Sequence, residues 1–145
     1  MANDLNYLAR RMGHYAKQVE RNAPLAVRLV ATSIAPVLVY ATPVDTSRAR
    51  VNWQAAIASV PSGVLFPYPD KPPSPDYGGA TATSQIIGTA KLYAGGSYIA
   101  IANNTPYIQK LNQGSSAQAP AAFVQQAVMV GIRSLHGFRV LRDGN

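Results

Sequence analysis

Histidine is the side chain most often used for acid–base chemistry and metal binding near neutral pH, and this chain has only two, His14 and His136. They do not form an HxxxH or HExxH pair, and the six acidic residues are scattered rather than clustered. A Ser-His-Asp triad has no supporting GxSxG context either. We therefore predict no catalytic residues, no metal site and no enzymatic activity.

Two glycine pairs, Gly78-Gly79 and Gly95-Gly96, are candidates for phosphate-binding loops. In such a loop the glycines precede Lys and Ser or Thr, whose side chains hold the phosphates and Mg²⁺. Neither pair has that continuation. The chain also lacks cysteine, which removes disulfides, thiolate metal sites and a cysteine nucleophile. We predict no cofactor.

Positive charge is the remaining chemical signal. The chain has 13 basic and 6 acidic residues, a net charge of +7, and seven of the basic residues fall in the first 50 positions. This charge can attract nucleic acid or an acidic protein surface, although a solvated helix face explains it equally well. The candidate DNA-facing or partner-facing residues are Arg10, Arg11, Lys17 and Arg21.

The eight tyrosines are dispersed through every predicted element. Aromatic side chains near basic groups can stack on nucleic-acid bases. Tyrosine is also a favoured anchor of protein interfaces. Because the tyrosines are dispersed in this way, we favour interface anchoring or core packing.

The composition is poor in charge for a soluble domain. Hydrophobic residues make up 48% of the 145 residues and charged residues 13%, against about 25% charged in a typical domain. Either uncharged polar residues cover the surface, or part of it is buried against other subunits. The length suits one domain, which we place at residues 1–137, followed by a basic C-terminal tail at 138–145.

No membrane partner is expected. The longest apolar run, Leu29 to Ala41, is interrupted by polar residues and is shorter than the roughly 20 residues of a membrane span. The N-terminal residues do not resemble a secretory signal.

Two helices are predicted before residue 42. Apolar residues recur at steps of three and four and line one face of the first: Leu5, Leu8, Met12, Tyr15 and Val19. The basic candidates lie off this stripe, so the helix has a cationic back. Asn22-Ala23-Pro24 should end it, because proline lacks an N–H donor. A second helix over residues 24–41 is apolar nearly all round, and Pro36 should kink or shorten it.

The middle of the chain is predicted to be a turn, a strand and a long loop. Thr42-Pro43 stops the helix, and the side chains of 45–47 close a turn. Residues 50–60 alternate as a strand, although a helix is also compatible with their alanines. Residues 61–79 form a Pro-rich segment, either a plain surface loop or an arm that contacts a neighbouring subunit. The candidate arm residues are Phe66, Tyr68 and Tyr77.

Helices and one more strand follow. A helix is predicted over residues 81–93 and a strand over 97–103. Asn104-Thr105-Pro106 ends that strand and starts a short helical turn through Leu111. Pro120 opens the last helix, and the tail after Gly137 is predicted to be loosely ordered.

Two segments resemble the signatures of a known family. Thr42 to Trp53 resembles the pattern TPVDTGRLRxxW of small neck or tail-completion proteins of tailed bacteriophages, with Ser47 in place of the usual glycine. Tyr98 to Phe123 resembles the pattern YIxNNxPYAxxLExGxSxQAPxGFV of the same family, with Asn112 in place of an acid and Ala122 in place of a glycine. The two matches cover about a third of the chain in the family's order.

The resemblance implies a structural virion protein. Such proteins form an oligomeric ring that joins the portal and head-closure complex to the tail. The family fold is α+β, with long N-terminal and C-terminal helices packed on a small antiparallel β-sheet, and this agrees with the elements predicted above. The implied partners are other copies of the chain and the neighbouring head-closure, adaptor, tail-terminator or tail-tube proteins, with phage DNA near the ring lumen.

We expect the protein in the virion neck or tail, and in the host cytoplasm during assembly. A tail terminator or other minor tail subunit is the nearest alternative, and a free basic nucleic-acid-binding protein is the alternative from another class. The predicted junction and capping residues are Asp45, Thr46, Arg48, Asn104 and Pro106. The predicted core or interface anchors are Trp53, Tyr107 and Phe123.

Overall fold

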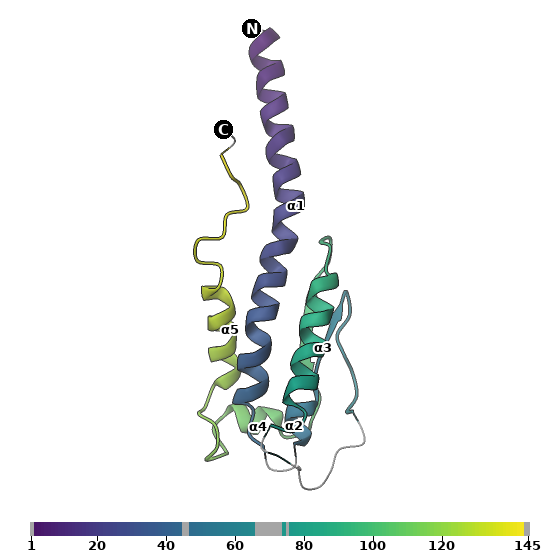
Figure 1. Ribbon diagram of the computed structural model, residues 1–145, viewed down its shortest axis with the longest axis vertical. Helices are drawn as coiled ribbons and strands as arrows, with labels where there is room; N and C mark the ends of the chain where they lie inside the picture. Colours follow the sequence, from purple (N-terminus) through teal and green to yellow (C-terminus); the bar gives the residue numbers. More distant parts are fainter. Residues whose placement is uncertain (1, 45–46, 66–73, 75, 144–145) are drawn as a thin grey trace.

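The computed structural model describes residues 2–44, 47–65, 74 and 76–143. One long N-terminal helix stands at the centre, with a two-stranded antiparallel sheet and its helix on one side and a shorter C-terminal helix on the other (Figure 1). The predicted α+β class, long N-terminal helix and small antiparallel sheet are confirmed. The elements of the described chain are α1 (Ala2–Ala41), α2 (Arg48–Val51), β1 (Trp53–Ile57), α3 (Gly79–Leu92), β2 (Ile99–Asn103), α4 (Ile108–Asn112) and α5 (Phe123–Arg133).

Helix α1 runs without interruption for 40 residues and contains both Pro24 and Pro36. The prediction that a first helix ends at Pro24 is wrong, and Pro36 does not shorten the helix. Each proline removes a backbone hydrogen bond, at a cost of about 3 kcal/mol in an isolated helix, but tertiary packing can outweigh such a preference. Pro24 is buried, and a Cβ atom built at Gly95 would lie 3.0 Å from its Cγ atom, so the loop after α3 closes over the proline.

The sheet pairs β1 with β2, with Trp53 opposite Asn103 and Ile57 opposite Ile99. Helix α3 covers the other edge of β1. The Ala55 N–H donates to Gln85 Oε1 at 2.9 Å, and Gln85 Nε2 donates to the Ala55 carbonyl at 3.0 Å. One amide side chain therefore satisfies both outward-facing backbone groups at the middle of an edge strand.

Helix α5 packs along α1 rather than on the sheet. Gly131 permits the close approach, because a Cβ atom there would lie 2.5 Å from Ile34 Cγ1. The prediction that both terminal helices pack on the sheet therefore needs correction, since it is α3 that packs against β1. The hydrophobic core contains Ala35, Leu38, Val39, Trp53, Ala55, Ala82, Ile86, Ala119, Phe123 and Ala127.

The predicted strand over residues 50–60 is shorter than expected, because residues 48–51 form the helical turn α2. Asn52 stabilises this turn: its Nδ2 donates to the Arg48 carbonyl at 2.8 Å, and its Oδ1 accepts the Leu65 N–H at 2.5 Å. A period-two pattern of apolar residues does not reveal such a side-chain bond. The other predicted helices and the second strand are present, with ends shifted by up to a few residues.

The C-terminal segment lies beside α1, where the sequence predicted a loosely ordered tail (Figure 1). Gln18 Nε2 donates to the Arg142 carbonyl at 3.1 Å, and the Arg142 N–H donates to Gln18 Oε1 at 2.7 Å. Asn22 Nδ2 donates to the Val140 carbonyl at 2.7 Å. Residues 2–21 of α1, which we call the projecting half, extend past α3 and α5 and touch the rest of the chain through this tail (Figure 1). Residues 24–41 form the covered half.

Among the described residues, α1 alone is long and apolar enough to cross a membrane by length and composition, with a mean hydropathy of 1.6 in its most apolar window. The sequence analysis considered only the shorter run from Leu29 to Ala41. The core helix of a folded domain passes the same test. Helix α1 packs against α3 and α5 and supplies Ala35, Leu38 and Val39 to the core, but only 22% of its most apolar window is buried. Core packing therefore accounts for part of the hydropathy of α1.

Candidate functional site

The two segments that carry the family resemblance lie against each other. Asn103 Nδ2 donates to the Ala49 carbonyl at 2.7 Å, and the Val44 N–H donates to Gln118 Oε1 at 2.9 Å. The guanidinium carbon of Arg48 lies 5.9 Å from the centre of the Tyr107 ring, within the range of a cation–π contact. We call this contact between residues 42–53 and 98–123 the junction. Arg48 thus joins the two segments, while its predicted neighbours Asp45 and Thr46 lie outside the described residues.

Trp53 and Phe123 lie in the core of the single chain, with 6% and 1% of their surface exposed. The Trp53 indole N–H donates to Thr42 Oγ1 at 2.8 Å, and that hydroxyl donates to the Leu38 carbonyl at 2.8 Å. The indole is therefore fixed to the end of α1. Tyr107 is half-buried at the junction. Of the two predicted roles, core or interface anchor, Trp53 and Phe123 occupy core positions.

Arg50 is a buried cation that the sequence analysis did not single out. Its Nη2 donates to the carbonyls of Tyr40 at 3.3 Å and Thr42 at 3.1 Å, and its guanidinium lies over the Tyr40 ring. Burial lowers the pKa of Arg50, while the charge of Asp76 opposes that shift. A cation at a helix C-terminus satisfies carbonyl groups that have no partner within the helix. Because Arg50 follows the end of α1 by nine residues, no local pattern in the sequence marked it as a cap of that helix.

One serine and one alanine at the junction have the left-handed backbone conformation that glycine adopts without steric cost. Ser47 has φ 65° and Ala122 has φ 61°. They precede α2 and α5, respectively. In the described chain, Ala58 is the only other non-glycine residue with positive φ. Ser47 and Ala122 are the positions where the resembled patterns have glycine.

Two asparagines of the second segment bind backbone groups of other parts of the chain. Asn112 Oδ1 accepts the Val124 N–H at 2.9 Å and so caps the start of α5, a role that the sequence analysis missed. Asn104 is exposed, and its Nδ2 donates to the Pro61 carbonyl at 3.0 Å. Pro106 is exposed in the turn before α4.

The candidate arm is only partly described. Phe66 and Tyr68 lie outside the described residues, as do the other residues of 66–73 and residue 75 of the predicted Pro-rich loop. Tyr77 is half-buried in the turn before α3, and its N–H donates to the Ser74 carbonyl at 3.1 Å.

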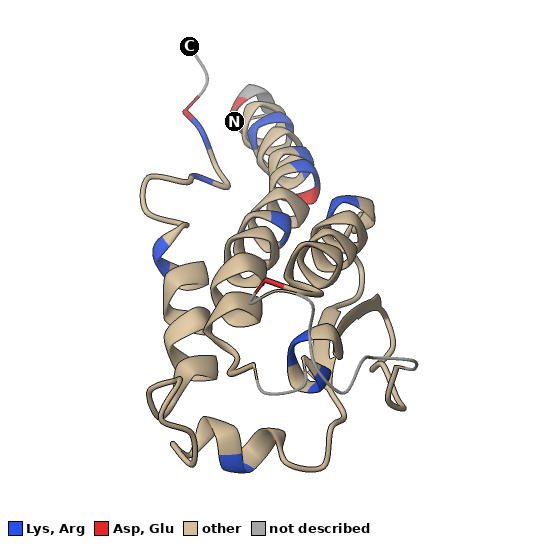
Figure 2. Ribbon diagram, turned by 60° about the horizontal axis from the view of Figure 1, so that its bottom comes forward, with Lys and Arg blue, Asp and Glu red and all other residues tan. Residues whose placement is uncertain are grey.

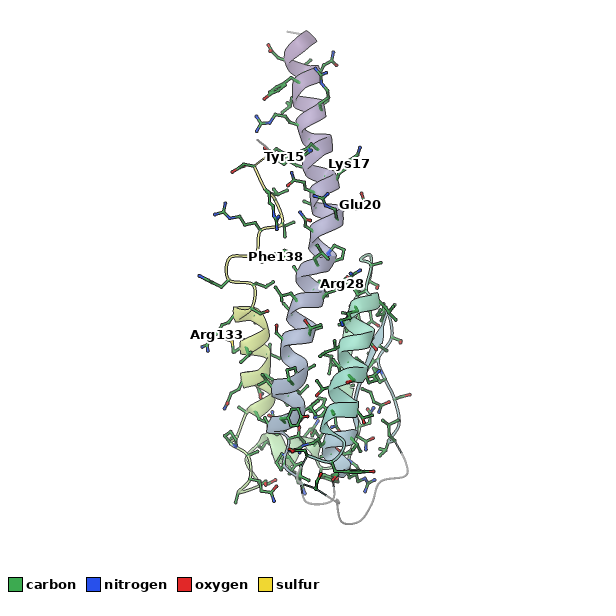
Figure 3. All side chains as sticks on the ribbon, viewed as in Figure 1. Tyr15, Lys17, Glu20, Arg28, Arg133 and Phe138 are labelled. Carbon is green, nitrogen blue, oxygen red and sulfur yellow. The ribbon has the colours of Figure 1, made fainter. Side chains whose placement is uncertain are left out.

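The basic candidates Arg10, Lys17 and Arg21 are exposed on the projecting half of α1. Their spacing of seven and four residues places them in one row along the helix. Figure 2 shows basic residues along this half, and in Figure 3 Lys17 leaves α1 on the side away from the C-terminal tail. Arg11 lies elsewhere: its guanidinium stands between the Tyr7 and Tyr15 rings, at 5.7 and 5.6 Å from their centres.

Large exposed apolar side chains gather on two helices. On the projecting half, Leu5, Leu8, Met12 and Val19 are 68%, 52%, 63% and 43% exposed, and we call these four residues the apolar stripe. The face of α5 that points away from α1 carries exposed Val128, Met129 and Ile132. A helix that is apolar all round is normally buried on all sides. The sequence analysis predicted the stripe, but it did not predict that these residues are exposed in the described part of the chain.

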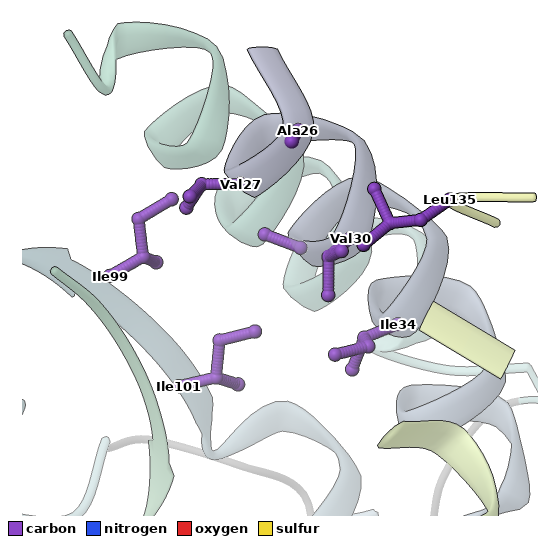
Figure 4. A pocket seen from close by; sticks show the side chains of 8 residues that line it. Ala26, Val27, Val30, Ile34, Ile99, Ile101 and Leu135 are labelled. Carbon is purple, nitrogen blue, oxygen red and sulfur yellow. The ribbon is translucent and has the colours of Figure 1, made fainter. Parts of the chain in front are cut away.

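An open apolar groove of about 280 Å³ lies between α1 and β2 (Figure 4). We call it the groove; its lining residues are Ala26, Val27, Val30, Ala31, Ile34, Ile99, Ile101 and Leu135. None of them is charged, so the groove suits an apolar partner rather than a polar substrate.

The described residues contain no group of three His, Cys, Asp or Glu that could hold a metal ion. The candidate functional features are surfaces that could bind a partner: the row of cations, the apolar stripe and the groove. The chain matches no protein-family model, no curated protein sequence and no solved structure.

Proposed function

We propose that the protein is a structural subunit of a tailed-bacteriophage virion, a neck or tail-completion protein that forms an oligomeric ring at the head–tail junction. The observation that carries the proposal is the backbone at Ser47 and Ala122. The resembled patterns have glycine at these positions, and both residues have positive φ. A non-glycine residue pays about 1–2 kcal/mol for that conformation. At both positions the chain therefore has the backbone conformation that a glycine would adopt without steric cost.

The exposed apolar surface supports a role in assembly. A subunit that works by binding its neighbours can leave apolar side chains exposed until assembly covers them. In a ring, one contact between two different surfaces of the subunit repeats until the ring closes. The neighbours above and below would be head-closure or adaptor proteins and tail-terminator or tail-tube proteins. A tail terminator or other minor tail subunit fits the same surfaces.

Mass measurement and imaging test this proposal. We expect the purified protein to form a defined oligomer in solution, and the chain to be found at the neck of the assembled particle by electron microscopy. A strictly monomeric protein that is absent from the particle would contradict the proposal. Activity as an enzyme, lost on His136→Ala, would contradict the nonenzymatic role.

Nucleic-acid binding is the second candidate function, favoured by the row of Arg10, Lys17 and Arg21. The test is a gel shift at several salt concentrations, comparing the wild type with the triple variant Arg10→Gln, Lys17→Gln, Arg21→Gln. Loss of three phosphate contacts should reduce the log–log salt slope by about 0.9 per contact. The matched control removes three exposed cations elsewhere: Lys91→Gln, Lys110→Gln and Arg133→Gln.

Tight, steeply salt-dependent DNA binding by the isolated chain, lost only in the Arg10/Lys17/Arg21 variant, would favour a free nucleic-acid-binding protein. An equal response of both triple variants would indicate a net-charge effect and remove any role for the row.

A further inference from the structure

The apolar stripe and the groove lie on the same side of α1. Moving from the N-terminus, apolar residues follow one another at steps of three and four into the groove. They are Leu5, Leu8, Met12, Ala16, Val19, Ala23, Val27, Val30 and Ile34. In a continuous helix this spacing keeps all of them on one face, about 45 Å long at 1.5 Å per residue. Helix α1 therefore carries one continuous apolar face. Nothing in the described chain lies over its N-terminal end, and β2 forms a wall beside its other end.

The walled end is the groove, where Ile99 and Ile101 of β2 stand opposite Val30 and Ile34 (Figure 4). The open end is the stripe, and among the described residues no strand or helix lies opposite it. A helix with an apolar stripe is the kind of element that fills such a groove, with residues at i, i+3, i+4 and i+7 as anchors.

The stripe cannot fill the groove of its own chain. Leu8 and Val30 are 22 residues apart on one unbroken helix, which is about 33 Å along its axis. Folding the stripe back onto the groove would require breaking α1. If the stripe fills a groove, that groove belongs to another molecule, and every further copy of this chain offers one.

The surface area of the chain is larger than that of a compact monomer and leaves room for two contacts of standard size. The chain exposes 9252 Å², whereas a compact monomer of its mass, 15.4 kDa, exposes about 7,200 Å². The difference is about 2,000 Å², and a standard interface removes about 800 Å² from each partner. The excess is thus close to what a subunit loses when it uses its stripe in one contact and its groove in another.

We propose that the apolar stripe of one copy lies in the groove of a second copy. The proposal rests on the self-assembly part of the proposed function and not on its assignment to a phage. Residues Arg10, Lys17 and Arg21 lie on the opposite face of α1, so the contact leaves them outside the interface. Val30 lies near the middle of the groove, and Leu8 lies about 6 Å along the helix axis from the middle of the stripe. A short cross-linker therefore spans the two positions whether the two helices run parallel or antiparallel.

Cysteine cross-linking tests the contact, because the chain contains no cysteine. The double variant Leu8→Cys, Val30→Cys should form intermolecular cross-links under mild oxidation or with a short bis-maleimide. The single variants Leu8→Cys and Val30→Cys and the double variant Arg10→Cys, Val30→Cys are the controls, and we expect at least about tenfold less cross-linked product from each. Efficient cross-linking of Leu8→Cys alone would mean that stripe pairs with stripe and would overturn the proposal.

The length of the cross-linked products separates this inference from the proposed ring. A ladder beyond the dimer shows a contact that repeats from copy to copy, as a ring requires. Products that stop at the dimer show a reciprocal pair, which keeps the stripe–groove contact but contradicts the ring. No cross-linking beyond the controls would overturn the contact itself.

A second measurement does not depend on cysteine chemistry. Leu8→Glu buries a charge in the proposed interface and should weaken association by at least about tenfold in analytical ultracentrifugation. Arg10→Glu makes a similar new charge on the opposite face and should leave association largely unchanged. Both positions are exposed in the single chain, so circular dichroism should show an intact fold. Equal association of wild type and Leu8→Glu would refute the contact.

Discussion

The covered and projecting halves of α1 both carry apolar residues at helical spacing, but their surroundings are opposite. In the covered half, Leu38 and Val39 are 3% and 0% exposed, because α3 and α5 flank the helix. In the projecting half, Leu5 and Met12 are 68% and 63% exposed. An apolar stripe at helical spacing indicates which face of a helix is buried when the helix packs against a partner. It does not indicate whether that partner belongs to the same chain or to another.

The difference in exposure suggests that the two halves of α1 have different roles. The covered half organises the fold, through the core and through the bond from Trp53 to Thr42 at its end. The projecting half is held by the C-terminal tail on one side and carries the apolar stripe on another. The following changes are expected to affect the two halves differently.

The largest difference is expected from truncating apolar side chains. Phe123→Ala removes a buried ring from the core around the covered half and should lower the free energy of unfolding by about 3–5 kcal/mol. Met12→Ala removes an exposed side chain and should change that free energy by no more than about 0.5 kcal/mol in the monomer. Urea denaturation at low protein concentration measures both. Similar losses would mean that the two halves are equally covered.

The bond between Trp53 and α1 should be the next most costly to lose. Thr42→Val removes the oxygen that accepts the indole N–H and leaves that buried donor without this partner. We expect a loss of about 1–3 kcal/mol in urea denaturation. Thr42→Ser keeps the hydroxyl and should recover most of the loss. If Ser and Val destabilise equally, packing of the threonine methyl group, and not the hydrogen bond, is what matters.

Adding one methyl group should have opposite signs at two helical glycines. At Gly131 a new Cβ atom would lie 2.5 Å from Ile34 Cγ1 of the covered half, so Gly131→Ala should destabilise by about 1–3 kcal/mol. At Gly13 of the projecting half nothing lies within 4 Å, so Gly13→Ala should stabilise by about 1 kcal/mol through helix propensity. Thermal denaturation of both variants gives the signs. Destabilisation by Gly13→Ala would show that the projecting half is not a free helix.

The smallest effect is expected where the tail meets the projecting half. Gln18→Ala removes both side-chain hydrogen bonds to the backbone of Arg142. The loss should be about 1 kcal/mol, because each bond is partly buried and competes with water. Hydrogen exchange of the Arg142 amide should become faster, while exchange in the covered half of α1 stays unchanged. An unchanged Arg142 amide would show that other contacts hold the tail.

The predictable parts of the fold were those set by neighbouring residues. The stripe from Leu5 to Val19, the alternation of residues 99–103 and the glycines after α3 each predicted an element that is present. The sequence analysis also selected Trp53, Phe123 and Arg48, which lie in the core or at the junction. It missed Arg50, Gln85 and Asn112, because their hydrogen-bond partners lie in other elements.

The sequence alone determined the type of most elements, because helical periodicity, strand alternation and turn chemistry depend on residues within a few positions of one another. Only the tertiary structure decided that α1 continues through Pro24 and Pro36, that Arg50 is buried at its end, and that α5 packs on α1 rather than on the sheet. It also decided which half of α1 remains uncovered. The physical reason is that packing between distant segments contributes more free energy than local preference, and a single apolar stripe is compatible with a partner from either the same chain or another.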